Sequence, residues 1–183
     1  MHGGCQGKLM NYGIFRAPVK HKIFVSYHHH ADQAYYDAFS REFHDSYDVI
    51  YDNSLERRID SDDVNYVMRR IRENHITGTS CTIVLVGAET PKRKYVDWEI
   101  SATLDKNHAL IGVRLPTARL TSDNRYVLVP DRLLDNINSG FASWLTWEQI
   151  TAGPNQLGQY IAEAKSRQIS LINNTRARRV RNG

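Results

Sequence analysis

Short apolar runs alternate with longer amphipathic segments along the chain. Residues 22–27 (KIFVSY), Cys81–Val86 and residues 109–115 are apolar runs rich in β-branched residues, which is typical of strands covered on both faces of a parallel sheet. Residues 48–52 (DVIYD) predict a further short strand, and residues 141–147 predict a last strand at the sheet edge. Together these runs predict a sheet of about five strands.

Apolar residues at helical spacing separate the predicted strands. Two helices precede the Cys81–Val86 run, the second starting at the acidic residues 60–63. A third covers residues 95–105, and a fourth starts at Gly153-Pro154. Their apolar stripes are Tyr35, Phe39 and Phe43; Val64, Val67, Met68 and Ile71; Val96, Ile100 and Leu104; and Leu157, Tyr160, Ile161 and Ala164. Residues 117–139 are polar, with one strand-like stretch at residues 126–129, and we assign no helix to them.

The alternation of strands and helices predicts a doubly wound α/β fold, with a mostly parallel five-stranded sheet and helices on both faces. We expect one domain over residues 21–170, a flexible segment over residues 1–20 and a basic tail over residues 171–183. No apolar run approaches the about 20 residues of a membrane span. The first residues, MHGGCQGKLMNYG, lack the apolar core of a signal peptide, so we expect a cytoplasmic protein without a membrane partner.

The charge of the chain is concentrated near its end. The formal net charge of +4 equals the charge of Arg176, Arg178, Arg179 and Arg181, so the remaining residues are formally neutral together. A basic tail is able to contact nucleic acid or anionic lipid, but such tails are more often solvated ends. We therefore expect a disordered tail and no nucleic-acid partner.

Glu99 is the first candidate for chemistry. It lies about one turn into the predicted helix of residues 95–105, off the apolar stripe, with Tyr95 one turn before it and Trp98 next to it. The start of a helix that follows a parallel strand lies above the carboxyl ends of the strands, where open α/β sheets bind ligands. The helix dipole also favours a charged carboxylate there. The plainer alternative is a surface glutamate that only complements this dipole.

Four segments in this order carry a family likeness: KIFVSYHH, DVIYD, GTSCTIVLVG and KYVDWEISATLDKNHALIGV. The set resembles the TIR domain, and in particular the bacterial TIR-like ThsB proteins of Thoeris anti-phage defence, over about residues 22–116. The resemblance implies a flavodoxin-like fold and cleavage of NAD, as a substrate and not a cofactor, at the nicotinamide–ribose bond. It also implies a cyclic or modified ADP-ribose signal that activates a separate effector, and protomers that associate into a homo-oligomer to complete their pockets.

The resemblance assigns roles residue by residue. The catalytic glutamate of the family usually lies four residues beyond a tryptophan; Glu99 matches this glutamate, and Tyr95 stands where the tryptophan would be. Tyr95 and Trp98 are expected to bind the substrate by walling its pocket; for each of them a position in the core is the alternative. The other substrate-binding residues that we expect lie at the ends of the first two strands: Tyr27, His28, His29 and Asp52.

Three alternatives stay open at this point. Consecutive histidines at positions 28–30 suit a metal poorly, because neighbouring side chains point in different directions and no Cys/His cluster completes a site; we expect no metal. A non-catalytic TIR-like interaction module would use the polar loop of residues 53–60 for protein contacts. A phospho-receiver domain would need an acidic pair where His28-His29 stands, and a lysine after the last parallel strand.

Overall fold

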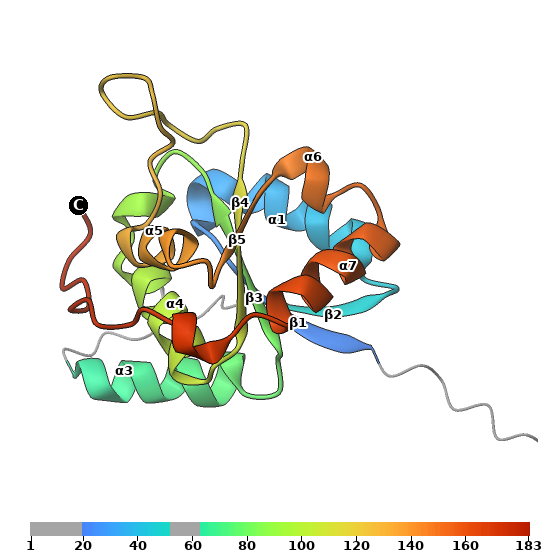
Figure 1. The fold of residues 1–183 in the computed structure, drawn as a ribbon, viewed down its shortest axis with the longest axis horizontal. Helices are drawn as coiled ribbons and strands as arrows, with labels where there is room; N and C mark the ends of the chain where they lie inside the picture. Colours follow the sequence, from blue (N-terminus) through green and yellow to red (C-terminus); the bar gives the residue numbers. More distant parts are fainter. Residues whose placement is uncertain (1–19, 52–62) are drawn as a thin grey trace, which may run out of the picture.

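The computed structural model describes residues 20–51 and 63–183, and its centre is a five-stranded sheet in the order β2-β1-β3-β4-β5 (Figure 1). Every pair of neighbouring strands is parallel. The strands are β1 (His21–Ser26), β2 (Tyr47–Tyr51), β3 (Cys81–Val86), β4 (Ala109–Arg114) and β5 (Ser143–Thr146). The predicted doubly wound sheet is confirmed, and β5 forms one edge as expected.

Helices cover both faces of the sheet. The α-helices are α1 (His29–Phe43), α3 (Val64–Ile71), α4 (Lys94–Asp105), α5 (Asp131–Asn138), α6 (Trp147–Ile150) and α7 (Pro154–Lys165). A π-helical turn, η1 (Arg72–Ile76), and the 3₁₀ turns η2 (Thr90–Lys92) and η3 (Ile169–Leu171) complete the elements that the described residues form. Helices α1, α6 and α7 lie on one face, and α3, α4 and α5 lie on the other (Figure 1).

Local sequence explains where these helices start. The side chain of Asp63 caps α3 by accepting hydrogen bonds from the backbone N–H groups of Asn65 and Tyr66, at 2.9 and 3.3 Å. Pro154 occupies the first turn of α7, where its missing N–H has no partner to lose. Both starts agree with the acidic and proline signals in the sequence.

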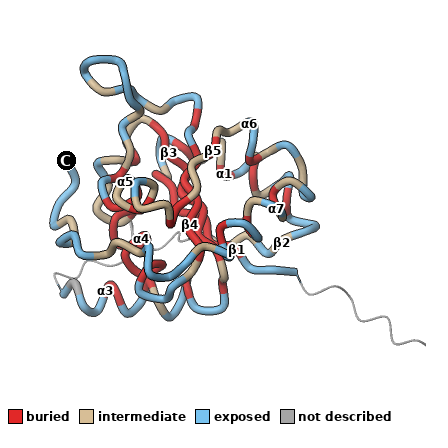
Figure 2. Tube along the Cα trace, in the orientation of Figure 1, coloured by how far each residue is buried: buried red, intermediate tan, exposed pale blue. Residues whose placement is uncertain are grey.

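Successive side chains of a strand point to opposite faces of the sheet, so the hydrophobic core consists of one layer on each face. Ile23 and Val25 of β1 pack with α1 and α7, whereas Phe24 packs with α3 and Trp98. All residues of β3 are buried, and burial is concentrated in the central strands and the helix faces against them (Figure 2). The buried stripe of α1 contains Tyr36, Phe39 and Phe43; the predicted Tyr35 is only partly buried.

Several predictions need correction. His29 and His30, which we placed at the end of the first strand, belong to the first turn of α1. Helix α5 was not predicted. Two of its three fully buried residues, Arg132 and Asn136, are polar, so its buried side shows no run of apolar residues at helical spacing. Residues 126–129 form no strand; only an isolated antiparallel bridge joins Leu120 to Val127.

The last residues of the chain are ordered against the domain. The predicted disordered tail over residues 171–183 is wrong: Figure 1 shows this segment running along α4, and hydrogen bonds tie it to α4 and α5. Asp52 and the loop of residues 53–60 lie outside the described residues, as do residues 1–19. Within residues 20–51 and 63–183, no helix combines the length and apolarity needed to cross a bilayer.

Candidate functional site

The candidate site lies at the carboxyl ends of β1 and β3. From β1, the chain passes to β2 on one side, while β3, β4 and β5 follow on the other, so the winding direction reverses between β1 and β3. Open α/β sheets bind their ligands at such a switch point. The residues that follow these two strands, and the first turns of α1 and α4, are therefore the ones that would meet a ligand.

Glu99 and Ser26 meet at this edge. The hydroxyl of Ser26, the last residue of β1, donates a hydrogen bond to Oε2 of Glu99 with an O–O distance of 2.5 Å. Both side chains are buried, with 1% of Ser26 and 5% of Glu99 exposed. A hydroxyl bonded to a carboxylate is a strong, directional contact at this distance. The carboxylate is thus fixed in place, and it is not the exposed surface residue of the plainer alternative.

Burial of Glu99 follows from the position of its helix. Val96, Ile100 and Leu104 pack on β3 and β4, while Trp98 and Ala102 pack against α3. Helix α4 is therefore covered on more than one side, and all residues from Val96 to Leu104 are buried. A charged residue in such a helix needs polar partners, because burying an unpaired charge is unfavourable. Ser26 supplies one for Glu99.

Tyr95 and Trp98 lie beside α3. Trp98 is buried in the core cluster that includes Phe24 and Met68, which agrees with the second of its two expected positions. Its indole N–H donates to the backbone carbonyl of Arg179 at 2.8 Å. Tyr95 is partly buried next to it, with ring centroids 5.6 Å apart in an edge-on arrangement. Their predicted substrate contacts stay predictions.

Tyr27 packs on the face of the sheet that α1 covers. Tyr27 lies in the cluster on the α1 face of the sheet, stacked on Tyr36 at 4.8 Å, and its hydroxyl donates to Gln33. His28 is buried at the N-cap position of α1, and the ring of His29 lies 4.5 Å from that of Tyr27. Roles for Tyr27, His28 and His29 in substrate binding stay predictions. In the described part of the chain, no three His, Cys, Asp or Glu side chains are grouped to hold a metal ion.

Asp32 is a buried carboxyl group at the same edge that the sequence analysis missed. It is 0% exposed, and Oδ2 accepts a hydrogen bond from the Thr90 hydroxyl at 2.8 Å. Gly87 makes room for it, because a Cβ there would lie 2.1 Å from Oδ1. Burial raises the pKa of Asp32 above its ordinary value. Its position four residues before the buried Tyr36, on the same helix stripe, is the signal that was available.

A second buried carboxylate on α4 points away from Ser26. Asp97 accepts a hydrogen bond from Nε of Arg132 at 2.8 Å, and both side chains are nearly inaccessible to solvent. A cavity of about 300 Å³ lies beside this pair, and the described residues that line it include Asp97, Arg93 and Arg179 but not Glu99. Cations and carboxylates both line this cavity, so it does not point to a ligand of one charge.

Fold and family together define the class of this protein. Its parallel sheet in the order β2-β1-β3-β4-β5, covered by helices on both faces, is a flavodoxin-like α/β fold. The family model of the Thoeris protein ThsB, TIR-like domain, matches residues 24–120, and the chain belongs to this family. The resemblance seen in the sequence is confirmed.

Comparisons with solved structures and with curated proteins do not extend this family assignment. The chain is similar to the TIR domains in the structure of the activated Roq1 resistosome directly recognizing the pathogen effector XopQ, with a TM-score of 0.37 and 13% identity. This match covers 53% of the present chain and 58% of the other, so it spans less than two thirds of that protein. No curated protein matches the sequence.

Proposed function

We propose that this chain is a TIR-like enzyme that cleaves NAD at the nicotinamide–ribose bond. Its product would be a cyclic or otherwise modified ADP-ribose that activates a separate effector in anti-phage defence. The observation that carries the proposal is the buried Glu99 carboxylate, held by Ser26 at the carboxyl ends of the strands. Membership of the ThsB TIR-like family supports it.

The proposed reaction explains why a buried carboxylate is needed. The bond between the ribose C1 and the nicotinamide nitrogen breaks, and the bonding electron pair leaves with neutral nicotinamide. Positive charge develops on the ribose, as in glycoside hydrolysis. A fixed carboxylate stabilises this charge most where water is excluded, and more strongly in the transition state than in the ground state. Glu99 would do this directly or by holding the ribose hydroxyls.

The second half of the reaction decides the product. Water that attacks the ribose C1 loses a proton and gives free ADP-ribose. A hydroxyl or ring nitrogen of the same molecule that attacks instead gives a cyclic product, also with loss of a proton. Tyr27, His28, His29, Asp52, Tyr95 and Trp98 are the residues that we propose as further substrate contacts, and Asp52 lies outside the described residues.

A non-catalytic interaction module is the second candidate. The segment between β4 and α5 projects beyond the helical layers (Figure 1). It carries large apolar side chains that are 41% exposed at Leu120, 69% at Tyr126 and 37% at Leu128. Apolar side chains gathered on a projecting segment favour a protein contact, although single exposed apolar residues are ordinary.

Incubation of the purified chain with NAD separates the two candidates. We expect mass spectrometry to detect nicotinamide and an ADP-ribose product. We also expect turnover to rise faster than linearly with protein concentration, because we propose that association of protomers completes the pocket. Strict proportionality would contradict this self-association. Intact NAD at concentrations where the chain associates would contradict the enzyme and favour the module.

A further inference from the structure

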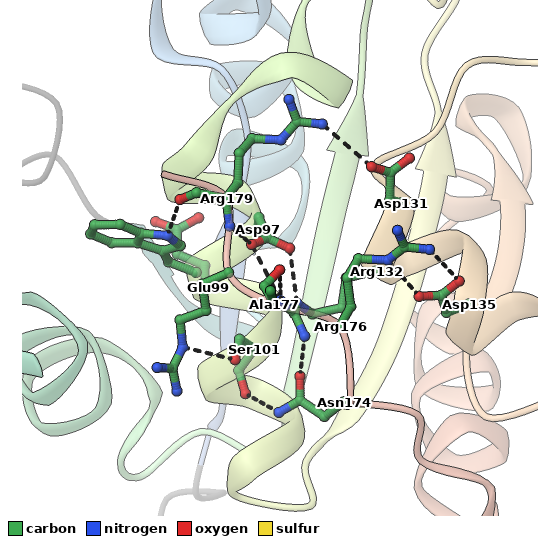
Figure 3. A network of polar contacts seen from close by, with 12 residues as sticks. Asp97, Glu99, Ser101, Asp131, Arg132, Asp135, Asn174, Arg176, Ala177 and Arg179 are labelled. Atoms are coloured by element: carbon green, nitrogen blue, oxygen red, sulfur yellow. Dashed lines mark hydrogen bonds and ion pairs between the residues drawn. The ribbon is translucent and has the colours of Figure 1, made fainter. Parts of the chain in front are cut away.

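Residues 173–183 form a C-terminal strap along α4, the helix that carries Glu99. Figure 3 shows the strap residues Asn174, Ala177 and Arg179 facing the buried pair of Asp97 and Arg132. The strap contacts are mainly made by backbone groups and by the side chains of Asn174 and Asn182, while its arginine side chains pair with acidic groups nearer the surface. The strap is therefore held on the domain by specific hydrogen bonds, and not only by the charge of its arginines.

The strap completes the hydrogen bonds of a buried arginine. Arg132 is 1% exposed and donates from Nε to Asp97 at 2.8 Å. It also donates from Nη1 to the side-chain oxygen of Asn174 at 2.7 Å, and from Nη2 to the carbonyl of Ala177 at 3.2 Å. All three guanidinium nitrogens thus have acceptors, two of them through the strap. A buried guanidinium without these acceptors would be strongly unfavourable.

The strap also binds α4 directly. The backbone N–H of Arg179 donates to Oδ2 of Asp97 at 2.8 Å, and the carbonyl of Arg179 accepts from the Trp98 indole at 2.8 Å. Asn174 donates to the carbonyl of Ser101 at 3.1 Å. Near the start of the helix, the side chain of Asn182 accepts from the backbone N–H of Lys94 at 2.9 Å. These contacts cover the first two turns of α4.

The contacts of the strap and the bond to Ser26 hold α4 from different sides. At about 100° per residue, Glu99 lies roughly 150° around the helix from the mean direction of residues 94, 97, 98 and 101. Glu99 bonds to Ser26 of the sheet, whereas the strap binds the far side of the same two turns. Apolar packing is not directional, but hydrogen bonds at fixed atoms restrict rotation and sliding of a helix.

We propose that the strap is a positioning element for Glu99. By fixing the rotation and axial position of α4, Ala177 and Arg179 would keep the Glu99 carboxylate within hydrogen-bond distance of Ser26 and aimed at the reacting ribose. The effect on catalysis rests on the proposed function, but the effect on the geometry of α4 does not. A misplacement of about 1 Å in such a group is expected to lower the rate about 100-fold.

Arg179→Pro and Arg179→Ala form a matched pair of variants. Arg179→Pro removes the N–H that donates to Asp97, whereas Arg179→Ala keeps it and removes the side chain that lies 3.5 Å from Asp131. We expect Arg179→Pro to lower kcat for NAD at least about 10-fold, with KM changed less than about 2-fold, because the lost placement acts in the transition state. Arg179→Ala should keep both constants within about 2-fold.

Two readouts of the same variants do not depend on turnover. In Arg179→Pro we expect faster amide hydrogen exchange in residues 94–105 than in the other helices, and a shift of the ¹³C carboxyl resonance of Glu99 as the Ser26 bond is lost. An unchanged resonance and exchange pattern would overturn the proposal even if the wild type leaves NAD intact. With an active wild type, equal kcat in the two variants would also overturn it.

A second pair covers the case in which Arg179→Pro does not fold. Asn174→Ala removes the bonds to Arg132 and Ser101, whereas Asn173→Ala removes only side-chain bonds to Thr175 within the strap. We expect the exchange of residues 94–105 and the Glu99 resonance to change in Asn174→Ala alone. The same response in both variants, or none in either, would overturn the positioning role.

Discussion

The two faces of the sheet are held in different ways. The face covered by α1, α6 and α7 has one continuous apolar cluster. The face covered by α3, α4 and α5 has two smaller clusters with buried polar side chains on the same layer. These polar residues are Ser26, Thr82, Asp97, Glu99, Ser101, Thr103, Arg132 and Asn136. Apolar burial suffices for the first face, whereas the second also needs hydrogen bonds that fix where its side chains point.

The difference indicates where chemistry is possible. Buried polar groups are unfavourable unless they are bonded, so they are not the simplest way to stabilise a helix on a sheet. On the α4 face they form directional contacts, and Glu99 is among them. On the other face, His28 and Asp32 are also buried; they lie at the N-cap and in the first turn of α1, and Asp32 bonds to Thr90.

The largest stability effect is expected when the buried ion pair is broken. Arg132→Met leaves Asp97 buried without its guanidinium, which should lower the free energy of unfolding by about 3–5 kcal/mol. Asp97→Leu combined with Arg132→Met should recover about half of this loss, since no charge is then left unpaired. Urea unfolding measures both. A loss below about 1 kcal/mol for Arg132→Met would contradict the expectation that the fold depends on the paired charges of Asp97 and Arg132.

The apolar face supplies the contrast for this experiment. Phe39→Ala should also lower the free energy of unfolding by about 3–5 kcal/mol, because it leaves a cavity. Adding Phe43→Ala, whose ring centroid lies 4.7 Å from that of Phe39, should increase the loss. Recovery in this double variant, as in the ionic pair, would remove the distinction between the two faces.

Neighbouring residues of β3 give a finer comparison. Thr82 faces α4 and its hydroxyl lies 2.7 Å from that of Thr103, which donates to the backbone carbonyl of Glu99. Ile83 faces the apolar cluster. Thr82→Val and Ile83→Val should each lower the free energy of unfolding by about 1 kcal/mol. We expect only Thr82→Val to lower NAD turnover per folded molecule as well; an equal loss of turnover in both would contradict the comparison.

The smallest effect concerns the pH dependence of stability. Burial, and then the nearby Glu89 carboxylate, raise the pKa of Asp32 in the folded state, so the folded chain holds this proton more tightly than the unfolded chain. The contribution of Asp32 to stability is therefore greatest below its ordinary pKa of 3.8 and is lost as pH rises through the raised pKa.

Asp32→Asn should remove this pH-dependent contribution. Asp135, whose pKa is lowered by Arg176, contributes with the opposite sign, so the quantity to measure is the difference between variant and wild type. Urea unfolding at several pH values should show the variant gaining stability relative to the wild type as pH rises from about 4. A difference that is constant with pH would contradict the raised pKa.

The sequence predicts elements better than it predicts the contacts between them. Strand β3 is predicted to the residue, because a continuous β-branched run has one simple interpretation. Helix α5 and the ordered strap are not predicted from the sequence. Arg132 and the terminal arginines are of a residue type that is usually exposed, and only the structure shows their partners. The partner of Glu99, Ser26, lies 73 positions away, and nothing local in the sequence identifies it.

Turnover of NAD by Glu99→Gln, compared with Glu163→Gln, tests the central claim most directly. Both variants replace a carboxylate with an amide of the same shape, one at the buried site and one on α7 beside Arg167. We expect both to fold, Glu99→Gln to lower kcat at least about 100-fold, and Glu163→Gln to keep it within about 2-fold. Wild-type turnover by Glu99→Gln would contradict the proposed role of this carboxylate.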